Sequence, residues 1–312
     1  MFNLKQIPED FKVKETINLK LLNKGGYKCY LLKKKNFTTN DAISLLSKKF
    51  RINFKDFGYA GNKDKKALTE QFISIKTNRD LKNFNFENIF LEFKGHLSDK
   101  IHLGNNLGNE FEIVVRNLSK KYAKINEIVN YFDEQRFSKN NVLIGKLLLQ
   151  RKFKEICNLL DVNNLNKLSK KELRFYLHSY QSYLFNKAAS TYLKKYKNYK
   201  KVEYSLGEFI FPKKSEKLKF PLISFDFKSG KKDKIYLDIL NSEGIKLDQF
   251  IIREHPWLIE ETTYRDVFVK VKNFKTLKYV KDDLNSGKFK QIIKFSLPKG
   301  SYATILVKQM FN

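Results

Sequence analysis

The chain has 312 residues, enough for one large domain or two of ordinary size. Hydrophobic residues make up 42% of it and aromatic residues 14%, and this composition excludes an intrinsically disordered protein. Lysine and arginine outnumber aspartate and glutamate by 62 to 33, which gives a formal net charge of +29. A charge so far from zero favours a polyanionic partner, most often a nucleic acid. The alternative explanation of the lysine excess is a general bias of the coding sequence towards lysine.

The sequence carries no pattern of metal-ligating side chains. Cys29 and Cys157 stand far apart, outside any Cys-x-x-Cys pair, and are predicted to be reduced core residues. The four histidines show no metal-ligand spacing either. The N-terminus does not resemble a signal peptide, and no window reaches the roughly 18 apolar residues of a membrane span. We therefore expect a soluble, cytoplasmic protein.

The first fifty residues predict two strands and one helix. Residues 10–15 alternate apolar and polar side chains, as a half-buried strand does, and residues 27–32 form a second strand after a Gly-Gly turn. From Thr38, a good helix cap, the pattern changes. Apolar residues then recur at helical spacing, at Ala42, Leu45, Leu46 and Phe50.

Residues 57–75, FGYAGNKDKKALTEQFISI, combine a tight turn with a charged cluster. They predict a strand, a turn containing Gly61, and a second extended run. The small residues of the turn would let another chain come close. Asp64 stands among three lysines, and nearby positive charge favours the ionised carboxylate. A catalytic carboxylate in an RNA groove requires this arrangement, but an ordinary surface ion-pair cluster also has it.

The rest of the chain mixes predicted helices and strands. Residues 111–115 predict a strand, and residues 120–132 a helix with Ile125, Ile128, Val129 and Phe132 on one face. Residues 133–166 look mostly helical and end in a polar break, DVNNLN, which is a plausible domain boundary. Residues 172–192 predict a long, aromatic-rich helix.

The C-terminal part returns to predicted strands, at residues 267–271, 291–295 and 302–307. Early strands mixed with single helices indicate an α/β or α+β fold rather than an all-helical one. Residues 194–201, KKYKNYKK, interleave tyrosine with lysine, which suits stacking on bases and contact with phosphates, or equally a solvated helix end.

Five segments of the chain form a pattern when taken in order: LKQIPEDFKVKE at 4–15, GYAGNKDKKALTEQ at 58–71, LGNNLGNEFEIVVR at 103–116, NYFDEQRFS at 130–138 and LPKGSYAT at 297–304. In sequence and in order they resemble segments of the TruD family of tRNA pseudouridine synthases. Each segment is weak evidence alone, but five in register across nearly the whole chain make a specific pattern.

The resemblance implies an α/β (α+β) fold in which a TruD-type insertion domain interrupts a pseudouridine-synthase catalytic domain with a mixed, largely antiparallel sheet. Mapped onto this chain, the catalytic domain comprises residues 1–163 and 266–312, and the insertion domain residues 164–265. The implied activity is isomerisation of the D-arm uridine at tRNA position 13 to pseudouridine. The implied partner is tRNA, with no metal, no organic cofactor and no membrane, and a monomer is the simplest state.

By the same resemblance, Asp64 is the catalytic carboxylate. It either attacks C1′ or C6 covalently or removes the C2′ proton of the ribose as a general base. Lys5 matches a family lysine beside the carboxylate. Lys63 is the other candidate for that place, although a phosphate contact suits it equally.

The resemblance also implies a pocket for a flipped-out base. Phe132 would hold the base and Asn130 would read its edge, while Arg136 would tie the loop or a phosphate. Without the resemblance, Phe132 fits a core position and Asn130 a helix C-cap. Asp133 and Ser138 stand where the family usually has glycine, so the loop differs if those positions need a positive φ.

Two other function classes remain open from the sequence. One is a non-catalytic RNA-binding or assembly protein that uses the same basic surface. The other is a metal-dependent nuclease, which requires a second carboxylate near Asp64, with Glu70 as the near candidate.

Overall fold

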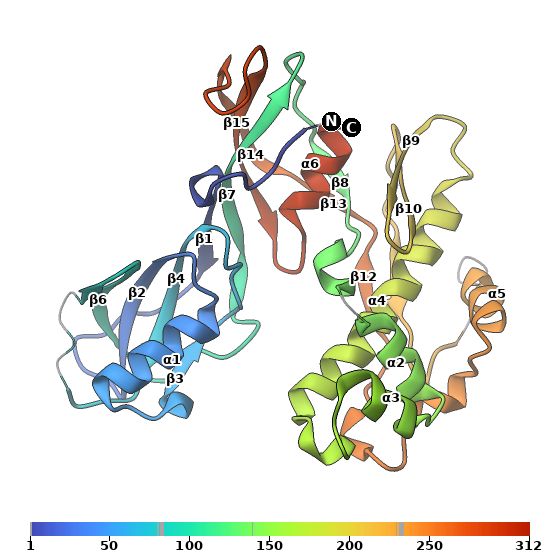
Figure 1. Cartoon of the computed structure of the whole chain (residues 1–312), viewed down its shortest axis with the longest axis horizontal. Helices are drawn as coiled ribbons and strands as arrows, with labels where there is room; N and C mark the ends of the chain where they lie inside the picture. Colours follow the sequence, from blue (N-terminus) through green and yellow to red (C-terminus); the bar gives the residue numbers. More distant parts are fainter. Residues whose placement is uncertain (1, 80, 82–83, 139, 229, 231–233) are drawn as a thin grey trace. The chain divides into compact units, whose positions relative to one another are not determined.

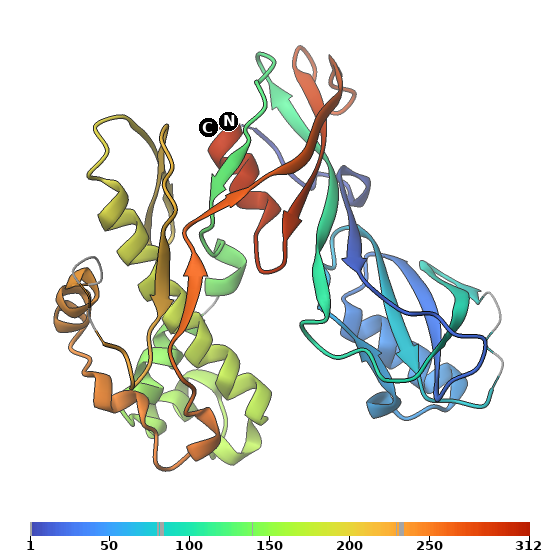
Figure 2. The same ribbon diagram turned by 180° about the vertical axis from the view of Figure 1, so that it is seen from behind.

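The computed structural model describes residues 2–79, 81, 84–138, 140–228, 230 and 234–312. The chain divides into two compact units (Figures 1 and 2). Unit 1 comprises Met1–Asn126, Lys270–Ala303 and Met310–Asn312, and unit 2 comprises Glu127–Val269 and Thr304–Gln309.

Among the described residues, unit 1 is built on one nine-stranded sheet, whose main path runs β14-β15-β7-β1-β4-β2-β6-β5, with β3 paired to β4. β1 and β4 run parallel, and the other pairs of neighbouring strands described in this sheet are antiparallel. This confirms a mixed, largely antiparallel sheet. The strands are β1 (Phe11–Ile17), β2 (Tyr27–Lys35), β3 (Phe57–Tyr59), β4 (Leu68–Ile75), β5 (Asn85–Phe86), β6 (Ile89–Leu97), β7 (Asn106–Leu118), β14 (Lys272–Lys281) and β15 (Phe289–Pro298).

Helix α1 (Thr39–Phe50) packs on one face of this sheet (Figure 1). Its predicted cap is confirmed, because the Thr38 side chain accepts a hydrogen bond from the Asp41 amide and the Asp41 carboxylate accepts one from the Thr38 amide. Ala42, Ile43 and Leu46 are fully buried and join the core cluster under the helix. This packing fixes the start of α1, which faces the turn that carries Asp64.

Unit 2 is organised around the long helix α4 (Lys170–Leu193), close to the prediction for residues 172–192. The α2 (Asn141–Leu149), α3 (Phe153–Leu160) and α5 (Lys234–Glu243) helices accompany it. Among its described residues, unit 2 also has three two-stranded sheets: β9 (Tyr199–Tyr204) with β10 (Gly207–Pro212), β11 (Lys219–Leu222) with β12 (Thr263–Asp266), and β8 (Glu127–Val129) with β13 (Phe268–Lys270). Short 3-10 helices span Pro8–Asp10, Phe54–Asp56, Glu134–Phe137, Leu165–Lys167, Leu247–Phe250 and Pro256–Leu258.

The prediction of a helix over residues 120–132 is wrong. Glu127–Val129 form strand β8, which pairs with β13, and the Asn130 amide donates to the carbonyl of Val267 at 2.7 Å. Most apolar residues that suggested a helix are β-branched and suit a strand as well. A distant partner strand therefore decided between two patterns that the local sequence allows.

The prediction of a strand over residues 302–307 is also wrong, because helix α6 (Ala303–Phe311) occupies this segment. Ala303, Leu306, Val307, Met310 and Phe311 are all buried. Their spacing of three, four, seven and eight residues from Ala303 is that of one helix face. The predicted strand covered only the six residues 302–307. So short a segment does not distinguish the helical period of 3.6 residues from the alternation of a strand.

The compact units divide the chain near residue 126, whereas the family-based expectation places the first domain boundary after residue 163. The assignment of residues 164–265 to an insertion domain stays a prediction. In the part of the chain that the structure describes, no helix is both long enough and apolar enough to cross a membrane.

Candidate active site

Asp64 lies in the turn between β3 and β4, and side chains from several elements hold this turn. The Gln71 amide of β4 donates to the carbonyl of Gly61 at 3.0 Å. The Thr39 hydroxyl at the start of α1 accepts from the Lys63 amide at 2.9 Å and donates to Gln71 at 2.8 Å. Thr39 and Gln71 are fully buried, so these bonds are protected from water. The backbone that carries the carboxylate is therefore fixed from both α1 and β4.

Lys34 adds a further hold on the turn, and the sequence analysis missed it. Its ammonium group donates to the carbonyls of Phe37 at 2.6 Å and of Asp64 at 3.2 Å. Burial lowers the pKa of Lys34 to about 8, although the charge of Asp64 acts in the opposite direction. Lys34 shares the buried face of β2 with Tyr30 and Leu32. This period-two alternation was the signal that could have found it.

The Lys63 side chain turns away from the carboxylate into the sheet. Its Nζ donates to Glu15 Oε1 of β1 at 2.7 Å and to Asn109 Oδ1 of β7 at 2.8 Å. The side chains of Lys63 and Glu15 are 6% and 0% exposed, so this ion pair is buried. Burial raises the pKa of Glu15, and the charge of Lys63 partly offsets that effect. Lys63 thus contacts Glu15 rather than Asp64, and a phosphate contact would require it to leave this pair.

Lys5 is the lysine that lies beside Asp64, at 2.6 Å between Nζ and Oδ2. The same ammonium group lies 4.0 Å from the centre of the Phe11 ring. The pair is part-buried, with side-chain exposures of 21% for Lys5 and 30% for Asp64. Lys5 adopts a left-handed backbone conformation, with φ of 53°, which a residue with a Cβ atom rarely does. A strained backbone here places an ammonium group directly on the candidate catalytic carboxylate.

Asn130 belongs to unit 2, where its side-chain amide is fixed by neighbours on β12. Arg265 donates through its terminal nitrogen to Asn130 Oδ1 at 2.7 Å and through Nε to the Asn130 carbonyl at 3.0 Å. Asn130 Nδ2 in turn donates to the carbonyl of Asp266 at 3.0 Å. The orientation of this amide is therefore set by its partners rather than left to rotate.

Phe132 is held by both its backbone and its ring. The Asn186 side chain of α4 accepts from the Phe132 amide at 2.9 Å and donates to its carbonyl at 2.8 Å. The Arg265 guanidinium lies 4.1 Å from the ring centre, and Phe185 meets the ring edge-on at 5.6 Å. Phe132 is 8% exposed. Arg265 thus joins Asn130 and Phe132 into one cluster. The sequence placed Arg265 only at the expected end of the insertion domain and did not predict this role.

Arg136 contacts residues of α2 and α4. Its guanidinium stacks over Phe175 of α4, 4.7 Å from the ring centre. Its amide donates to the carbonyl of Asp133 at 2.8 Å, and its carbonyl accepts from Asn141 at 3.3 Å. These contacts tie the loop to the helices, one of the two roles expected of Arg136.

The two departures from the family's glycine pattern do not strain this loop. Asp133 has φ of −93° and Ser138 has φ of −54°, so neither position uses the left-handed region. The Asp133 carboxylate is buried and accepts from Lys308 at 2.7 Å, and the nearby Glu134 binds the same lysine at 2.9 Å. A lysine therefore compensates the carboxylate that this chain adds.

A hollow of about 530 Å³ lies over β1, β2, β4 and β7 in unit 1. Charged side chains of both signs line it, namely Lys12, Lys14, Lys33, Lys34, Lys35, Lys294, Glu70, Glu87, Glu110 and Glu112. Glu70 therefore faces this hollow, and Asp64 is not among its lining residues. Among the described residues, no three His, Cys, Asp or Glu side chains are placed to hold a metal ion together.

The structure thus collects the expected residues into two groups. Lys5, Lys63 and Asp64 belong to unit 1, and Asn130, Phe132 and Arg136 belong to unit 2. Within the first group, Lys5 contacts the carboxylate and Lys63 anchors the turn behind it. Within the second group, Arg265 links Asn130 to Phe132.

Comparison with known proteins identifies the family. The model of the family "tRNA pseudouridine synthase D (TruD)" matches residues 2–164 and 213–310. The tRNA pseudouridine synthase D of Aquifex aeolicus is 30% identical over 382 aligned positions, which cover 99% of this chain and 97% of that protein. A protein of Methanocaldococcus jannaschii named "Probable tRNA pseudouridine synthase D 2" is 31% identical, with coverage of 99% and 91%.

The fold agrees with this assignment. A crystal structure of a Methanosarcina mazei protein described as "Putative tRNA pseudouridine synthase D (TruD)" superposes with a TM-score of 0.68 and 24% identity, covering 98% of this chain and 93% of that one. The expected α/β fold with a largely antiparallel sheet is thereby confirmed. The matches span the segments that carry Asp64, Asn130 and Phe132, and the chain belongs to the TruD family of tRNA pseudouridine synthases.

Proposed function

We propose that this protein isomerises the uridine at position 13 in the D arm of tRNA to pseudouridine, with Asp64 as the catalytic carboxylate. The observation that carries the proposal is the Lys5 to Asp64 contact of 2.6 Å, on a turn whose backbone is fixed by buried hydrogen bonds. A positioned carboxylate with a cation beside it is what the reaction needs, and the family membership supplies the substrate class.

The reaction requires no co-reactant, because no atom is gained or lost. The C1′–N1 bond of the uridine breaks, the uracil turns, a C1′–C5 bond forms, and the proton on C5 is released as N1 takes one up. Ionised Asp64 acts either as a nucleophile on C1′ or C6, or as a base on the C2′ proton. Lys5 favours the ionised carboxylate, which is the form that both the nucleophilic and the base mechanism require at the start.

The substrate base has to leave the helical stack before Asp64 can reach it. We assign recognition of that base to Asn130 and Phe132. An amide carries two N–H donors, and Asp266 takes one at Asn130, so the other is suited to a uracil carbonyl oxygen. The Phe132 ring, or the Arg265 guanidinium that covers one of its faces, provides the surface on which a base stacks.

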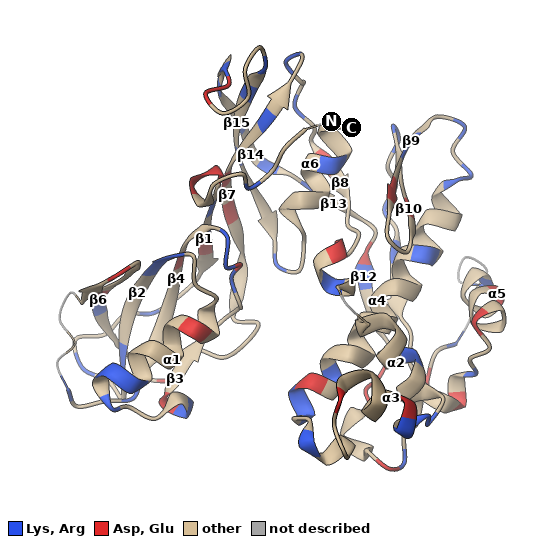
Figure 3. Ribbon diagram, viewed as in Figure 1, with Lys and Arg blue, Asp and Glu red and all other residues tan. Residues whose placement is uncertain are grey.

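The net charge of +29 fits a large polyanionic substrate such as tRNA. Lysine and arginine are spread over elements of both units (Figure 3). Phosphate contacts by such side chains release counterions, so the affinity for tRNA should fall steeply with salt.

The test uses unmodified tRNA transcripts incubated in EDTA with wild-type protein or with Asp64→Asn. Pseudouridine is mapped by carbodiimide labelling and primer extension. A transcript with cytidine at position 13 serves as the substrate control. Asp99→Asn serves as the protein control, because Asp99 is an exposed carboxylate of unit 1 that accepts a hydrogen bond from the neighbouring Ser98 hydroxyl.

We expect one stop, at position 13, with wild type and with Asp99→Asn, and none with Asp64→Asn at unchanged tRNA binding. Binding of tRNA by both proteins without any stop would favour an RNA-binding or assembly role. In a parallel incubation with Mg²⁺ in place of EDTA, cleavage of the transcript that is absent in EDTA would favour the nuclease alternative.

A further inference from the structure

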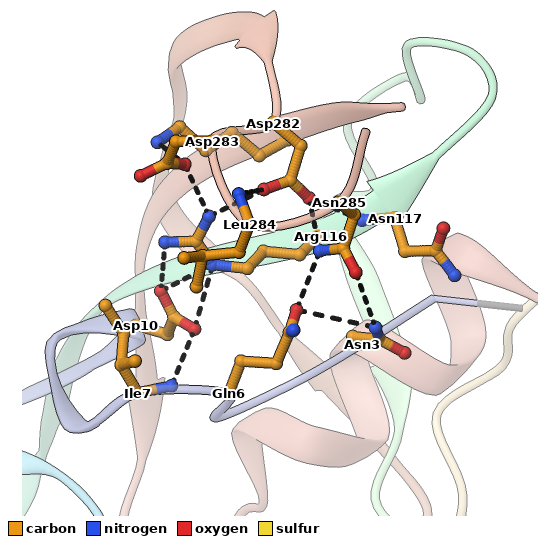
Figure 4. A network of polar contacts seen from close by, with 11 residues as sticks. Asn3, Gln6, Ile7, Asp10, Arg116, Asn117, Asp282, Asp283, Leu284 and Asn285 are labelled. Atoms are coloured by element: carbon orange, nitrogen blue, oxygen red, sulfur yellow. Dashed lines mark hydrogen bonds and ion pairs between the residues drawn. The ribbon is translucent and has the colours of Figure 1, made fainter. Parts of the chain in front are cut away.

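A charge cluster in unit 1, buried except at Asp283, contacts the chain segment that carries Lys5. Arg116 of β7, 3% exposed, stands at its centre (Figure 4). Its Nε donates to both oxygens of Asp10, at 2.9 and 3.0 Å, and its NH1 donates to Asp282 and Asp283, each at 2.7 Å. We call these four residues, together with Asn285, the Arg116 cluster. The cluster is distinct from the Asp64 turn, and the chemistry of uridine isomerisation does not use it.

The cluster holds the N-terminal segment on both sides of Lys5. Before Lys5, the backbones of Asn3 and Arg116 exchange two hydrogen bonds of 3.0 Å. After Lys5, the Ile7 amide donates to Asp10 at 3.2 Å, and the Gln6 side chain accepts from Asn285 at 2.8 Å. Figure 4 shows these contacts converging on one segment from β7 and from the turn between β14 and β15.

The turn between β14 and β15 carries the carboxylates that bind the Arg116 guanidinium. The Asp282 carboxylate accepts hydrogen bonds from the Asn117 and Leu284 amides, at 2.9 and 3.0 Å, and from the Asn285 side chain at 2.8 Å. Burial alone would raise the pKa of Asp282, but these hydrogen bonds and Arg116 lower it below its ordinary value. The turn therefore presents a fixed negative charge and a fixed Asn285 amide at the same time.

Lys5 needs such a hold, because its left-handed backbone, with φ of 53°, is disfavoured for any residue with a Cβ atom. Sparsely populated backbone conformations persist only where their surroundings over-determine them. Fixed contacts at Asn3, Gln6 and Ile7 supply that constraint here. With the backbone so placed, the Lys5 ammonium reaches both the Phe11 ring and Asp64 Oδ2.

We propose that the Arg116 cluster is a positioning device for catalysis: it fixes the strained N-terminal segment so that Lys5 contacts Asp64. Arg116 and Asn285 are then positioning residues that act through Lys5. This inference rests on the proposed function, since it assigns a catalytic consequence to the geometry around Asp64.

The test variant is Asn285→Ala, because Asn285 contacts Gln6 at the edge of the cluster, whereas loss of Arg116 would leave buried carboxylates unpaired. Asn53→Ala is the matched control, since Asn53 lies in unit 1 and its side chain caps its own short helix by accepting from the Lys55 amide. The rate of pseudouridine formation is measured in single turnover at saturating protein. Each variant is made in the wild-type and in the Lys5→Met background.

We expect Asn285→Ala to slow the wild-type reaction about tenfold or more at unchanged tRNA affinity, because small displacements of a catalytic group cost large factors in rate. In the Lys5→Met background it should have no further effect, while Asn53→Ala should be neutral in both. Equal slowing in the two backgrounds, or no slowing in either, would overturn the proposal.

Hydrogen exchange of the amides of residues 3–7 gives a second result that does not depend on activity. Exchange should be at least tenfold faster in Asn285→Ala and unchanged in Asn53→Ala. Unchanged exchange in both variants would show that the cluster does not hold this segment. If wild-type protein forms no pseudouridine, the proposed function fails by itself, and the exchange result still decides whether the cluster fixes the segment.

Discussion

Lys63 Nζ lies 2.7 Å from Glu15 Oε1, in an ion pair whose two side chains are at most 6% exposed. The pair joins the turn that carries Asp64 to β1, and Asn109 of β7 completes it. The residue next to the candidate catalytic carboxylate therefore anchors the turn from within the sheet. The structure shows Lys63 as an anchor of the turn, and its assignment to a substrate contact stays a prediction.

Lys63→Met is expected to destabilise the protein by about 3 kcal/mol, because it leaves the buried Glu15 carboxylate without its partner. Urea unfolding measures this change. The double variant Glu15→Gln with Lys63→Met should recover part of the loss, since it removes the unpaired charge. If Lys63 instead contacts a phosphate, Lys63→Met would keep the stability of the wild type. The slope of the logarithm of the tRNA binding constant against the logarithm of salt concentration would then fall by about one in magnitude.

Lys5→Met is expected to slow pseudouridine formation at least tenfold, because it removes the ammonium group from Asp64 in a part-buried site. Lys12→Met is the matched control, because Lys12 forms an ion pair with Glu112 at a similar distance, 2.7 Å, on the surface of the same sheet. The side chains of Lys12 and Glu112 are 49% and 31% exposed. Single-turnover rates at saturating protein compare the two variants. Similar rates for both would argue that the Lys5 contact has no part in the reaction.

Phe132 is more deeply buried than a pure substrate contact requires, so Phe132→Ala should cost about 3 to 5 kcal/mol of stability. Phe132→Leu is the better probe, because it keeps most of the volume and removes the ring. We expect this variant to lose turnover more than stability, measured by single-turnover rate and by thermal unfolding.

Phe185→Leu is the control, since Phe185 is fully buried and meets the Phe132 ring edge-on. It should lose stability while its rate, measured on folded protein, stays close to wild type. Parallel losses of rate and stability in both variants would make Phe132 a core residue only.

Lys34 predicts a dependence of stability on pH. Its pKa in the folded protein, about 8, lies below the ordinary lysine value of 10.5, so the unfolded chain binds more protons between these two pH values. The contribution of Lys34 to stability therefore rises as pH increases from about 8 to 10.5 and is lost as pH falls through 8. The difference in unfolding free energy between wild type and Lys34→Met should shift in favour of wild type over this window. A difference that stays constant from pH 7.5 to 10 would contradict the lowered pKa.

Several features could be predicted from the sequence because local signals sufficed. The α1 helix followed from the cap at Thr38 and the helical spacing after it, and α4 followed from a long uninterrupted pattern. The strand, turn and strand around Asp64 followed from alternation and from Gly61. The resemblance to the family pointed to Asp64 as the candidate carboxylate and to Lys5, with Lys63 as the alternative, as the lysine beside it.

The tertiary structure decided what local patterns leave ambiguous. Residues 127–129 form a strand because β13, far along the chain, offers a partner. The roles of Lys5 and Lys63 differ because their partners differ. The Lys63 ammonium group binds Glu15 and Asn109, which are remote in sequence, whereas the Lys5 ammonium group contacts Asp64. Sequence therefore determined which chemical groups are present and most elements that carry them. Their pairing depends on contacts between residues tens to hundreds of positions apart, and such contacts exist only in the folded chain.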